Sequence, residues 1–479
     1  MKGSMSYWVT LIVIVWMSVM VRKSKGVRSI KDQVSQFVED RVPLGTKWAF
    51  LVAGSNGFEN YRHQANVCHA YQVLKSGGLK DENIIVMMFD DIAYHPKNPK
   101  RGVIMNRPNG PNVYRGVPKD YTGNNVNPRN FFAVLSGNKS ATIGGSGKVL
   151  NTNSHDSIFI YMSGHGAVHV FGLINKGDIW AADLVNALKK KHAALAYKKM
   201  VIYIESCHSG SMLENLLPGN IGIYATTASK VNENSYAMYC PGTPYSPPAG
   251  ITFCLGDTYS ISWMEDSETS KRSTHTLYRQ YLNVAKRMVE HIDPGYISHV
   301  MKYGDTTAVW NDAIGKYFGD GSARLVNKIS DGSAFSYEHF NTTRLVKQDD
   351  ASLLHLKLEL EKAPHGSEDK SKAQKELDDE LARRKHEDHT INLIVDLLFG
   401  EEKDSIKMDH VHKVDLHDVD YWDCLKMLWK TYQDHCGILS PYGKKLYSKV
   451  SVNMCNVGIS ETQIIAATSQ ACPIKNHIS

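Results

Sequence analysis

Two polar segments follow apolar runs at points where a buried strand is expected to end. The first, SIFIYMSGHG (157–166), places His165 between two glycines, and the second, KMVIYIESCHSGS (199–211), places Cys207 after its apolar run. An imidazole can accept the proton of a thiol, and the thiolate can then attack an acyl carbon. Backbone N–H groups of Gly166 and Cys207 could bind the oxyanion that develops. The two segments therefore predict a Cys–His acyl-transfer site.

Each residue also has a simpler explanation. A cysteine at a strand end is commonly a small core residue, and a loop histidine is commonly solvated. A metal site is a further alternative, with His165, His169, Cys207 and His208 as its ligands. The sequence lacks compact ligand spacing such as CxxC or HExxH, which disfavours metal. The joint position of histidine and cysteine at two strand ends favours catalysis.

Other apolar runs supply the sheet that must position this pair. Strands are expected at 47–53, 83–89, 157–163, 199–205 and 221–228, with helices at 60–78 and 179–193. The strand runs do not alternate with polar residues, which is typical of a mostly parallel sheet covered on both faces. Ligands bind such sheets at the carboxyl ends of the strands. The intervening residues 91–155 are rich in Asn, Gly and Pro and predict long loops.

The second half of the chain changes character. Residues 273–300 are expected to be helical, and 302–340 are mixed. Residues 351–400 are dominated by Lys, Glu, Asp and Leu, which predicts charged helices, or simply a solvated helix pair. Residues 420–475 combine helical apolar spacing with four cysteines and predict a small stapled helical module.

Length and charge limit the class of protein. The 479 residues predict two or three folded units. Lys and Arg number 55 against 49 Asp and Glu, a formal charge of +6, without a basic stripe carrying interleaved aromatics. A nucleic-acid partner is therefore not expected.

The N-terminus carries a targeting signal. An apolar run (7–21) follows Lys2 and precedes Arg22 and Lys23. This pattern predicts a secretory signal peptide, with an uncleaved anchor as the alternative. The run is shorter than the roughly 20 residues that span a bilayer, so stable membrane association is not expected.

Entry into the secretory pathway changes how the eight cysteines are interpreted. Cys240 and Cys254 bracket a Pro/Gly-rich loop that they could close, whereas Cys68 and Cys207 have no obvious partners. The other four suggest disulfides in the C-terminal module: Cys424, Cys436, Cys455 and Cys472. Asn138 and Asn341 begin glycosylation sequons.

Several segments together resemble the legumain family, also called asparaginyl endopeptidases or, in plants, vacuolar processing enzymes. They span nearly the whole chain after the apolar run and include WAFLVAGSNGFENYRHQANVCHAYQVLKSGGLKDENIIV, DDIAY, GVPKDYTG, GGSGKVL, GHG, ESCHSGS, IYATTAS and LGDTYSISWMEDSE. The proline-containing 240–254 loop resembles the plant branch. The resemblance implies an α/β, caspase-like catalytic domain followed by an all-α, disulfide-stapled prodomain.

The resemblance also implies roles for individual residues. Cys207 matches the nucleophile, His165 its imidazole, Asn60 the residue that orients this imidazole, and Gly166 an oxyanion donor. The family cleaves after Asn, and after Asp at acid pH, and its specificity pocket maps onto Arg62, His63, Glu205, Ser235 and Asp257. An Asn side chain offers one acceptor oxygen and one donor amide, which a pocket of mixed charge can satisfy. The implied disulfides are Cys424–Cys455 and Cys436–Cys472, although four cysteines allow three pairings.

This chain departs from the family beside the site. The family usually carries Asp where Gly164 stands, and Glu where His208 stands. Plant members usually read GPGVLGMP after the His-Gly pair, whereas this chain reads AVHVFGLIN (167–175). At the position of the family's serine pair in the pocket, this chain carries Asn234 and Ser235. Loss of the carboxylate should make the imidazolium less favoured, so the usual pH profile and the balance of hydrolysis and ligation are open.

The domain boundaries expected are a signal peptide at 1–22, an N-terminal propeptide at 23–45, a catalytic domain at 46–340, linker and activation-peptide helices at 341–400, and a helical prodomain at 401–479. The prodomain would cover the active site as an intramolecular inhibitor. Self-cleavage is expected near Asn341, Asp349 and Asp350. At acid pH, protonated carboxylates in 349–388 would weaken ion pairs to a basic catalytic face and release the prodomain.

The function expected is that of an asparagine-specific cysteine endopeptidase made as a zymogen. It would act on Asn-containing peptides and proteins through a Cys207 thioester, without metal or other cofactor, in a vacuolar or lysosome-like compartment. One alternative is a peptide asparaginyl ligase or cyclase, for which Ala167 and the 167–175 loop would leave room for an incoming amine. Another is a catalytically silent relative that binds peptides.

Overall fold

A six-stranded sheet carries the two segments that end in His165 and Cys207. In the computed structural model, which describes residues 45–174, 177–243, 246–289, 298–321, 345–403 and 418–473, its strand order is β11-β8-β7-β3-β1-β2. The strands are β1 (Lys47–Ala53), β2 (Ile84–Met87), β3 (Ser157–Ser163), β7 (Lys199–Glu205), β8 (Ile223–Thr227) and β11 (Met301–Gly304). All neighbours pair in parallel except β11, which runs antiparallel to β8. The expected mostly parallel α/β sheet is confirmed.

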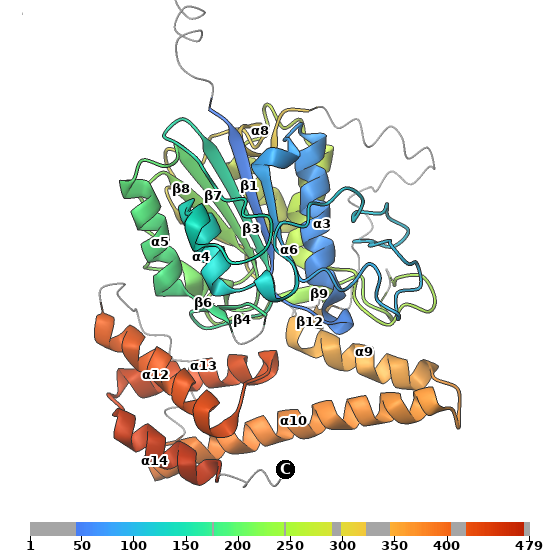
Figure 1. Ribbon diagram of the computed structural model, residues 1–479, viewed down its shortest axis with the longest axis vertical. Coiled ribbons are helices and arrows are strands. Elements are labelled where there is room, and N and C mark those ends of the chain that lie inside the picture. The colour runs from blue at the N-terminus through green and yellow to red at the C-terminus, as the bar shows by residue number, and fades with distance from the viewer. Residues whose placement is uncertain are drawn as a thin grey trace, which may run out of the picture. The chain divides into compact units, whose positions relative to one another are not determined.

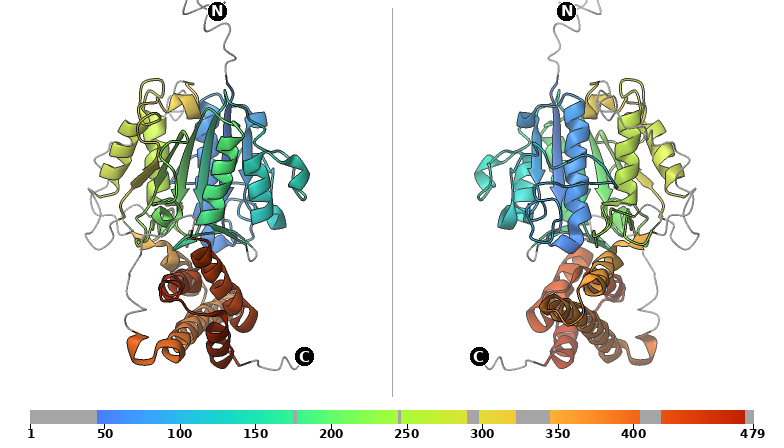
Figure 2. Two further views of the ribbon diagram at one scale, coloured as in Figure 1. Left: turned by 90° about the vertical axis from the view of Figure 1, so that its left-hand side faces the viewer. Right: turned by 90° about the vertical axis from the view of Figure 1, so that its right-hand side faces the viewer.

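Helices cover both faces of this sheet (Figures 1 and 2). Leu51, Phe159 and Tyr203 of the strands pack with α3 (Tyr61–Ser76), α6 (Thr258–Thr269) and α7 (Leu277–Arg287) in one apolar core. Phe50, Ile160 and Ile202, one position along each strand, pack with α4 (Pro128–Ser136) and α5 (Ala181–Ala193) in the other. Successive strand residues point to opposite faces, so burial on both explains why these runs are continuously apolar.

The register of the two central strands sets the position of the site. Residues of β3 and β7 pair from Ser157 with Lys199 to Ser163 with Glu205. Both strands therefore end at the same level, and His165 and Cys207 each lie two residues beyond. The prediction that both follow strands ending at one edge of the sheet is confirmed.

Short elements at this edge carry further site residues. One small sheet contains β4 (Gly166–Ala167), β5 (Val170–Gly172) and β6 (Asp178–Trp180), and the other contains β9 (Tyr236–Met238), β10 (Gly256–Asp257) and β12 (Val346–Lys347). The remaining short helices are η1 (Phe58–Asn60), η2 (Asp81–Asn83), η3 (Gly123–Asn125), η4 (Lys139–Ala141), η5 (Ser209–Met212), α8 (Gly315–Phe318) and η9 (Gly400–Glu402).

Two sequence-based expectations need correction. Residues 91–155 are not all loop, because α4 forms within them. Its signals were present: the Asn127 side chain accepts a hydrogen bond from the Asn130 N–H, Pro128 occupies the first turn, and Gly137 ends the helix at φ 76°. Strand β11 was also missed, because its four residues lie at the sheet edge and lack a long apolar run.

The C-terminal residues are helical, as expected. Helices α9 (Gln348–Lys362) and α10 (Glu368–Phe399) precede α12 (Val419–Cys436), α13 (Pro441–Asn456) and α14 (Glu461–Ala471). Disulfides join Cys424 to Cys455 and Cys436 to Cys472, the pairs that the resemblance implies, and a third joins Cys240 to Cys254. Apolar residues of α10 and of α12–α14 share one core with Ala167 and Val170, and α13 lies against β4.

Several expectations concern residues outside the described ranges. These are the signal peptide (1–22), the N-terminal propeptide (23–45) except for Gly45, and Asn341 with its sequon and cleavage site. Among the helices of the described ranges, none combines the length and apolar character needed to cross a bilayer.

Candidate active site

The thiol of Cys207 is enclosed by polar groups from two other segments. The residue is 1% exposed. Its Sγ accepts a hydrogen bond from the Ser235 N–H at 3.4 Å and lies 3.7 Å from Oδ1 of Asp349. Ser235 precedes β9, whereas Asp349 lies in the first turn of α9. The C-terminal helices therefore reach the thiol of the predicted nucleophile, Cys207.

The imidazole of His165 is held in one tautomer by Asn60. The Asn60 Nδ2 group donates to the carbonyl of Asn56 at 2.9 Å, which turns Oδ1 toward His165 Nε2 at 2.7 Å. An amide oxygen only accepts, so Nε2 must carry the hydrogen and donate it. The lone pair of Nδ1 is thereby left available, and Nδ1 has no hydrogen-bond partner among the described residues. The arrangement suits a general base.

Gly166 lies where only glycine fits. A Cβ atom on this residue would collide with the carbonyl oxygen of Cys207 and with the Ser206 side chain. The backbone of Gly166, directly after His165, therefore lies against the backbone of Cys207. The geometry is compatible with a substrate carbonyl sitting against this backbone.

In this closed state the catalytic pair is neutral. Burial, followed by the positive charge of Arg62, lowers the pKa of His165 to about 3. Burial, followed by the negative charge of Asp349, raises the pKa of the Cys207 thiol. A thiol is a poor nucleophile compared with a thiolate. Burial in this closed state therefore disfavours the charged forms of both side chains.

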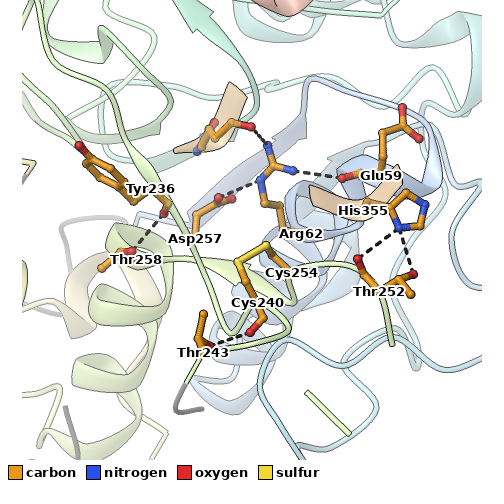
Figure 3. The surroundings of a disulfide bond; sticks show 11 residues. Glu59, Arg62, Tyr236, Cys240, Thr243, Thr252, Cys254, Asp257, Thr258 and His355 are labelled. Atoms are coloured by element: carbon orange, nitrogen blue, oxygen red, sulfur yellow. Dashed lines mark hydrogen bonds and ion pairs between the residues drawn. A yellow bond between two sulfur atoms is a disulfide. The ribbon is translucent and has the colours of Figure 1, made fainter. Parts of the chain in front are cut away.

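A buried charged pocket lies beside the nucleophile. The Arg62 Nε donates to Asp257 Oδ1 at 3.0 Å, close to the Cys240–Cys254 disulfide (Figure 3). Asp257 also accepts from Asn66 at 2.7 Å, a residue that the sequence did not single out. Burial raises the pKa of Asp257, which Arg62 opposes.

The other pocket residues converge on the same space. Glu205 accepts hydrogen bonds from the backbone and hydroxyl of Ser260 at 3.0 and 2.9 Å. Burial, and then repulsion by Asp257, raise the pKa of Glu205. His63 donates to or accepts from Ser55 at 2.6 Å, and its ring packs edge-on against His165 at 4.9 Å. The structure thus brings together Arg62, His63, Glu205, Ser235 and Asp257.

A primary amide fills this pocket. Gln348, the first residue of α9, donates from Nε2 to Glu205 Oε1 at 3.1 Å, and its backbone carbonyl oxygen accepts from Arg62 Nη2 at 3.1 Å. Its side-chain oxygen Oε1 has no hydrogen-bond partner among the described residues. Its backbone N–H donates to the carbonyl of Ser235. Gln348 is fully buried. The sequence analysis missed this residue, since nothing local in its sequence connects it with a pocket built more than 90 residues earlier.

The first departure from the family is explained by packing. A Cβ atom on Gly164 would lie 2.9 Å from Cζ of Phe171, which is fully buried. Phe171 stands where the plant members have leucine, and Gly164 where the family has aspartate. The Phe171 ring and the backbone of Gly54, whose Cα atom would lie 3.2 Å away, occupy the space that a side chain at 164 would need.

The other departures place two histidines in left-handed backbone. His169 (φ 61°) stands where the plant members have glycine, and His208 (φ 54°) directly follows the nucleophile. Their Nδ1 atoms bond the carbonyl oxygens of Ser211 and Val231, respectively. Burial lowers the pKa of each to about 4. Within the described ranges no three His, Cys, Asp or Glu side chains are placed to hold a metal ion, so the alternative ligand set is not assembled.

A cavity of about 180 Å³ adjoins His165, and Arg62, Glu205 and Asp257 do not line it. Its sheet-side wall includes Gly166, Ala167, Val170, Gly172 and Ile174. The opposite wall comes from the α12–α13 connection and the first turn of α13, with Ile438, Leu439, Pro441 and Lys444. The C-terminal part of the chain therefore covers His165 as well as Cys207.

Acidic C-terminal helices were expected to pair with a basic catalytic face, and the ion pairs between the two parts follow this polarity only in part. Lys97 pairs with Glu359 and Glu376, a basic residue of the sheet-bearing part against acidic helices. The polarity is reversed in two others, Lys444–Asp178 and Lys426–Asp183. The catalytic face is therefore not simply basic, because its rim near β6 and α5 is acidic.

The predicted processing sites differ in exposure. Asn138 is exposed, as glycosylation requires. Asp349 is buried and paired with Lys445, whereas Asp350 is half exposed and paired with Arg384. Both lie in the first turn of α9. Cleavage after either residue stays a prediction and requires α9 to unwind first.

Comparisons with known proteins agree with this geometry. The family model for the Peptidase C13 family matches residues 47–320, and the model for the legumain prodomain matches residues 375–472. The vacuolar-processing enzyme of Vicia sativa is 48% identical over 428 residues, which cover 89% of this chain and 86% of that protein. Legumain of Canavalia ensiformis is 45% identical over 435 residues, covering 91% and 90%.

A crystal structure of caspase-1 from Spodoptera frugiperda matches with a TM-score of 0.34 at 9% identity, covering 58% of this chain and 90% of the caspase chain. That likeness is distant, and the fold described above rests on the sheet itself. The sequence matches extend over catalytic and C-terminal parts alike. The chain belongs to the peptidase C13, or legumain, family of cysteine endopeptidases.

Proposed function

We propose that this protein is an asparagine-specific endopeptidase made as a zymogen, in which residues from Gln348 onward block the active site until they are displaced. The observation that carries the proposal is the side-chain amide of Gln348, whose Nε2 donates to Glu205, while the backbone carbonyl of Gln348 accepts from Arg62 of the same pocket. Asn carries the same primary amide one methylene closer to its backbone. A pocket that pairs buried charges with an amide disfavours residues that leave those charges unpaired.

The reaction would proceed through an acyl-enzyme. Nδ1 of His165 takes the thiol proton of Cys207, and Sγ attacks the backbone carbonyl carbon of the substrate Asn residue. The oxyanion accepts hydrogen bonds from the backbone N–H groups of Gly166 and Cys207. Nδ1 then returns the proton to the leaving amine, and a thioester remains on Cys207. Water, deprotonated by the same imidazole, hydrolyses the thioester and regenerates the thiol.

Cleavage after Asp would require acid pH. A protonated carboxyl has one acceptor oxygen and one donor hydroxyl, and thus resembles the amide of Asn. An ionised carboxylate has acceptors only and would face Glu205 and Asp257. The rate after Asp should therefore rise as the substrate carboxyl, with an ordinary pKa of about 3.9, becomes protonated.

The site of action is proposed to be a vacuole or a similar acidic compartment. Two relatives are named vacuolar-processing enzymes, from Vicia sativa and Arabidopsis thaliana. The exposed sequon at Asn138 and the three disulfides suit passage through the secretory pathway.

The test is mass spectrometry on the acid-activated protein given a peptide with one internal Asn, alongside matched peptides with Gln, Asp or Ala at that position. We expect a single cut after Asn, slower cleavage after Asp that increases toward acid pH, and no product from Cys207→Ala. Equal cleavage of the Asn and Ala peptides would contradict the proposed specificity. Absence of product after prodomain removal would favour a silent peptide-binding relative.

A second candidate, peptide ligation, is favoured by the cavity beside His165. Its wall there is apolar, with Ala167, Val170 and Ile174, and could seat an incoming peptide amine while excluding water. The same assay with excess amine-bearing acceptor peptide distinguishes the two reactions. A joined product shows ligation, and hydrolysis alone excludes it.

A further inference from the structure

Asp178 is a carboxylate whose partner in this state is a residue of the C-terminal helices. It begins β6, and its side chain is 6% exposed. Oδ1 lies 2.6 Å from Nζ of Lys444, a residue of α13. The Lys444 side chain is 13% exposed. Lys444 belongs to the segment matched by the legumain prodomain. When that segment leaves, Asp178 remains with the sheet and loses this cation.

The carboxylate lies at the edge of the cavity beside His165. Gly172 of β5 lines the cavity and pairs with Asp178 of β6. A Cβ atom on Gly172 would stand 3.9 Å from Asp178 Oδ1. Lys444 is itself part of the cavity wall. The ammonium group that occupies this corner in the closed state thus shows how a lysine side chain reaches Asp178 across the cavity.

This cavity lies on the path of the leaving group. The pocket for the residue before the cleaved bond is built from Arg62, Glu205 and Asp257, and none of these lines the cavity. His165 does line it. The imidazole must protonate the departing amine, so the chain after the cleaved bond passes on the His165 side.

We propose that Asp178 is a specificity residue of the mature enzyme, which binds a Lys or Arg side chain of the substrate shortly after the cleaved bond. The inference rests on the proposed function. Asp178 loses its ion-pair partner when the C-terminal helices leave, so a cationic side chain that takes the place of Lys444 is favoured over a neutral or acidic one. The substrate would repeat the contact that the C-terminal helices make.

Asp183 provides a matched control. It also pairs with a lysine of the C-terminal helices, Lys426, at 2.9 Å. Its side chain is 40% exposed, and it does not line the cavity. Water can hydrate this carboxylate, so its loss should not change the choice of substrate.

The experiment compares kcat/KM of the activated enzyme for peptides that differ only in carrying Lys, Leu or Glu at the first, second or third position after Asn. We expect the Lys peptide to exceed the Glu peptide by roughly tenfold at one of these positions, the value of one charge-assisted hydrogen bond. Asp178→Asn should reduce this ratio to near one, and Asp183→Asn should keep it. Equal rates for Lys and Glu peptides, or a ratio that survives Asp178→Asn, would overturn the inference.

A charge swap covers the case in which Asp178→Asn fails to fold. The double variant Asp178→Lys with Lys444→Glu keeps the ion pair of the closed state and should prefer Glu peptides once activated. A retained Lys preference would count against Asp178. If no peptide is cut after Asn, the proposed function has failed. Fluorescence anisotropy of labelled Lys and Glu peptides on acid-opened Cys207→Ala protein then decides the inference, because equal affinities would overturn it.

Discussion

The side-chain nitrogen of Gln348 lies 3.1 Å from Oε1 of Glu205, so an amide from the C-terminal helices occupies the pocket next to the nucleophile. The following residue, Asp349, contacts Cys207 and pairs with Lys445. Inhibition is therefore built from two consecutive residues at the start of α9, one in the pocket and one at the thiol.

Gln348→Ala should loosen this closed state. The substitution removes one hydrogen bond to a buried carboxylate and leaves Glu205 with an unfilled pocket, at a cost of roughly 1.5–3 kcal/mol. We expect Cys207 of the intact zymogen at pH 7 to react with iodoacetamide at least about tenfold faster. Gln374→Ala is the control, because Gln374 is exposed on α10 and its side chain donates to Asp378 on the same helix. Equal labelling of wild type and Gln348→Ala would show that Gln348 does not hold α9 in place.

Acid opening should depend on His169. Its ring packs 5.1 Å from Trp422 of α12, and burial lowers its pKa from 6.5 to about 4. A group whose folded pKa is lowered in this way binds protons more readily in the open state. The closed state therefore loses stability as pH falls below 6.5, by at most roughly 3 kcal/mol near pH 4.

Asp349 titrates in a lower range. Burial opposes its ionisation, but Lys445 lowers its pKa below 3.8, so this ion pair contributes stability above that value and loses it only below. His169→Asn removes the titration and suits left-handed backbone, where Asn is tolerated.

The measurement is hydrogen exchange of α12 and α13 in wild type and variant at matched pH. The pH at which these helices open should move to lower values in His169→Asn. His386→Asn, on the exposed face of α10, should leave it in place. An unchanged opening pH in His169→Asn would assign the acid response to other groups, His208 first among them.

Replacing Gly164 by the family's aspartate, beside the imidazole of His165, should destabilise the protein unless a second residue is changed as well. In Gly164→Asp the new Cβ atom would lie 2.9 Å from Phe171 Cζ, and overpacking of this kind costs about 1–3 kcal/mol. We expect a lower melting temperature for Gly164→Asp and recovery in Gly164→Asp with Phe171→Leu, since the two positions are in contact and should not be additive. Phe131→Leu is the control for the second substitution, because Phe131 lies in the same apolar core but its ring packs against Phe50 and Phe132. Additive losses in the double variant would refute the coupling.

The parts of the site that could be predicted are those fixed by the sheet. His165 and Cys207 follow two apolar runs that pair in register, so sequence order alone places them at one edge. The sequence also contained the signals of α4, whose capping residues were overlooked in a segment rich in Asn and Gly.

Contacts made by the C-terminal helices could not be predicted. Gln348 meets Glu205 across 143 positions, and Lys444 meets Asp178 across 266. Neither residue has an unusual neighbourhood in the sequence, and charge composition alone suggested the wrong polarity at Asp178. Such pairings depend on how two folded parts pack, which local patterns do not encode.

Asn60 should control both the rate and the pH profile of the activated enzyme. Asn60→Ala removes the acceptor that fixes Nε2–H of His165, so the tautomer with a free Nδ1 is no longer enforced, and kcat should fall by roughly ten- to a hundredfold. Asn60→Asp keeps an acceptor but adds a negative charge, which favours the imidazolium. The acid limb of kcat/KM should then move to higher pH, because the base must be neutral to take the thiol proton. Asn151→Asp, the same change at an exposed position of the catalytic part, is the control. A pH profile for Asn60→Asp that overlays the wild type would mean that Asn60 does not contact His165 in the active enzyme.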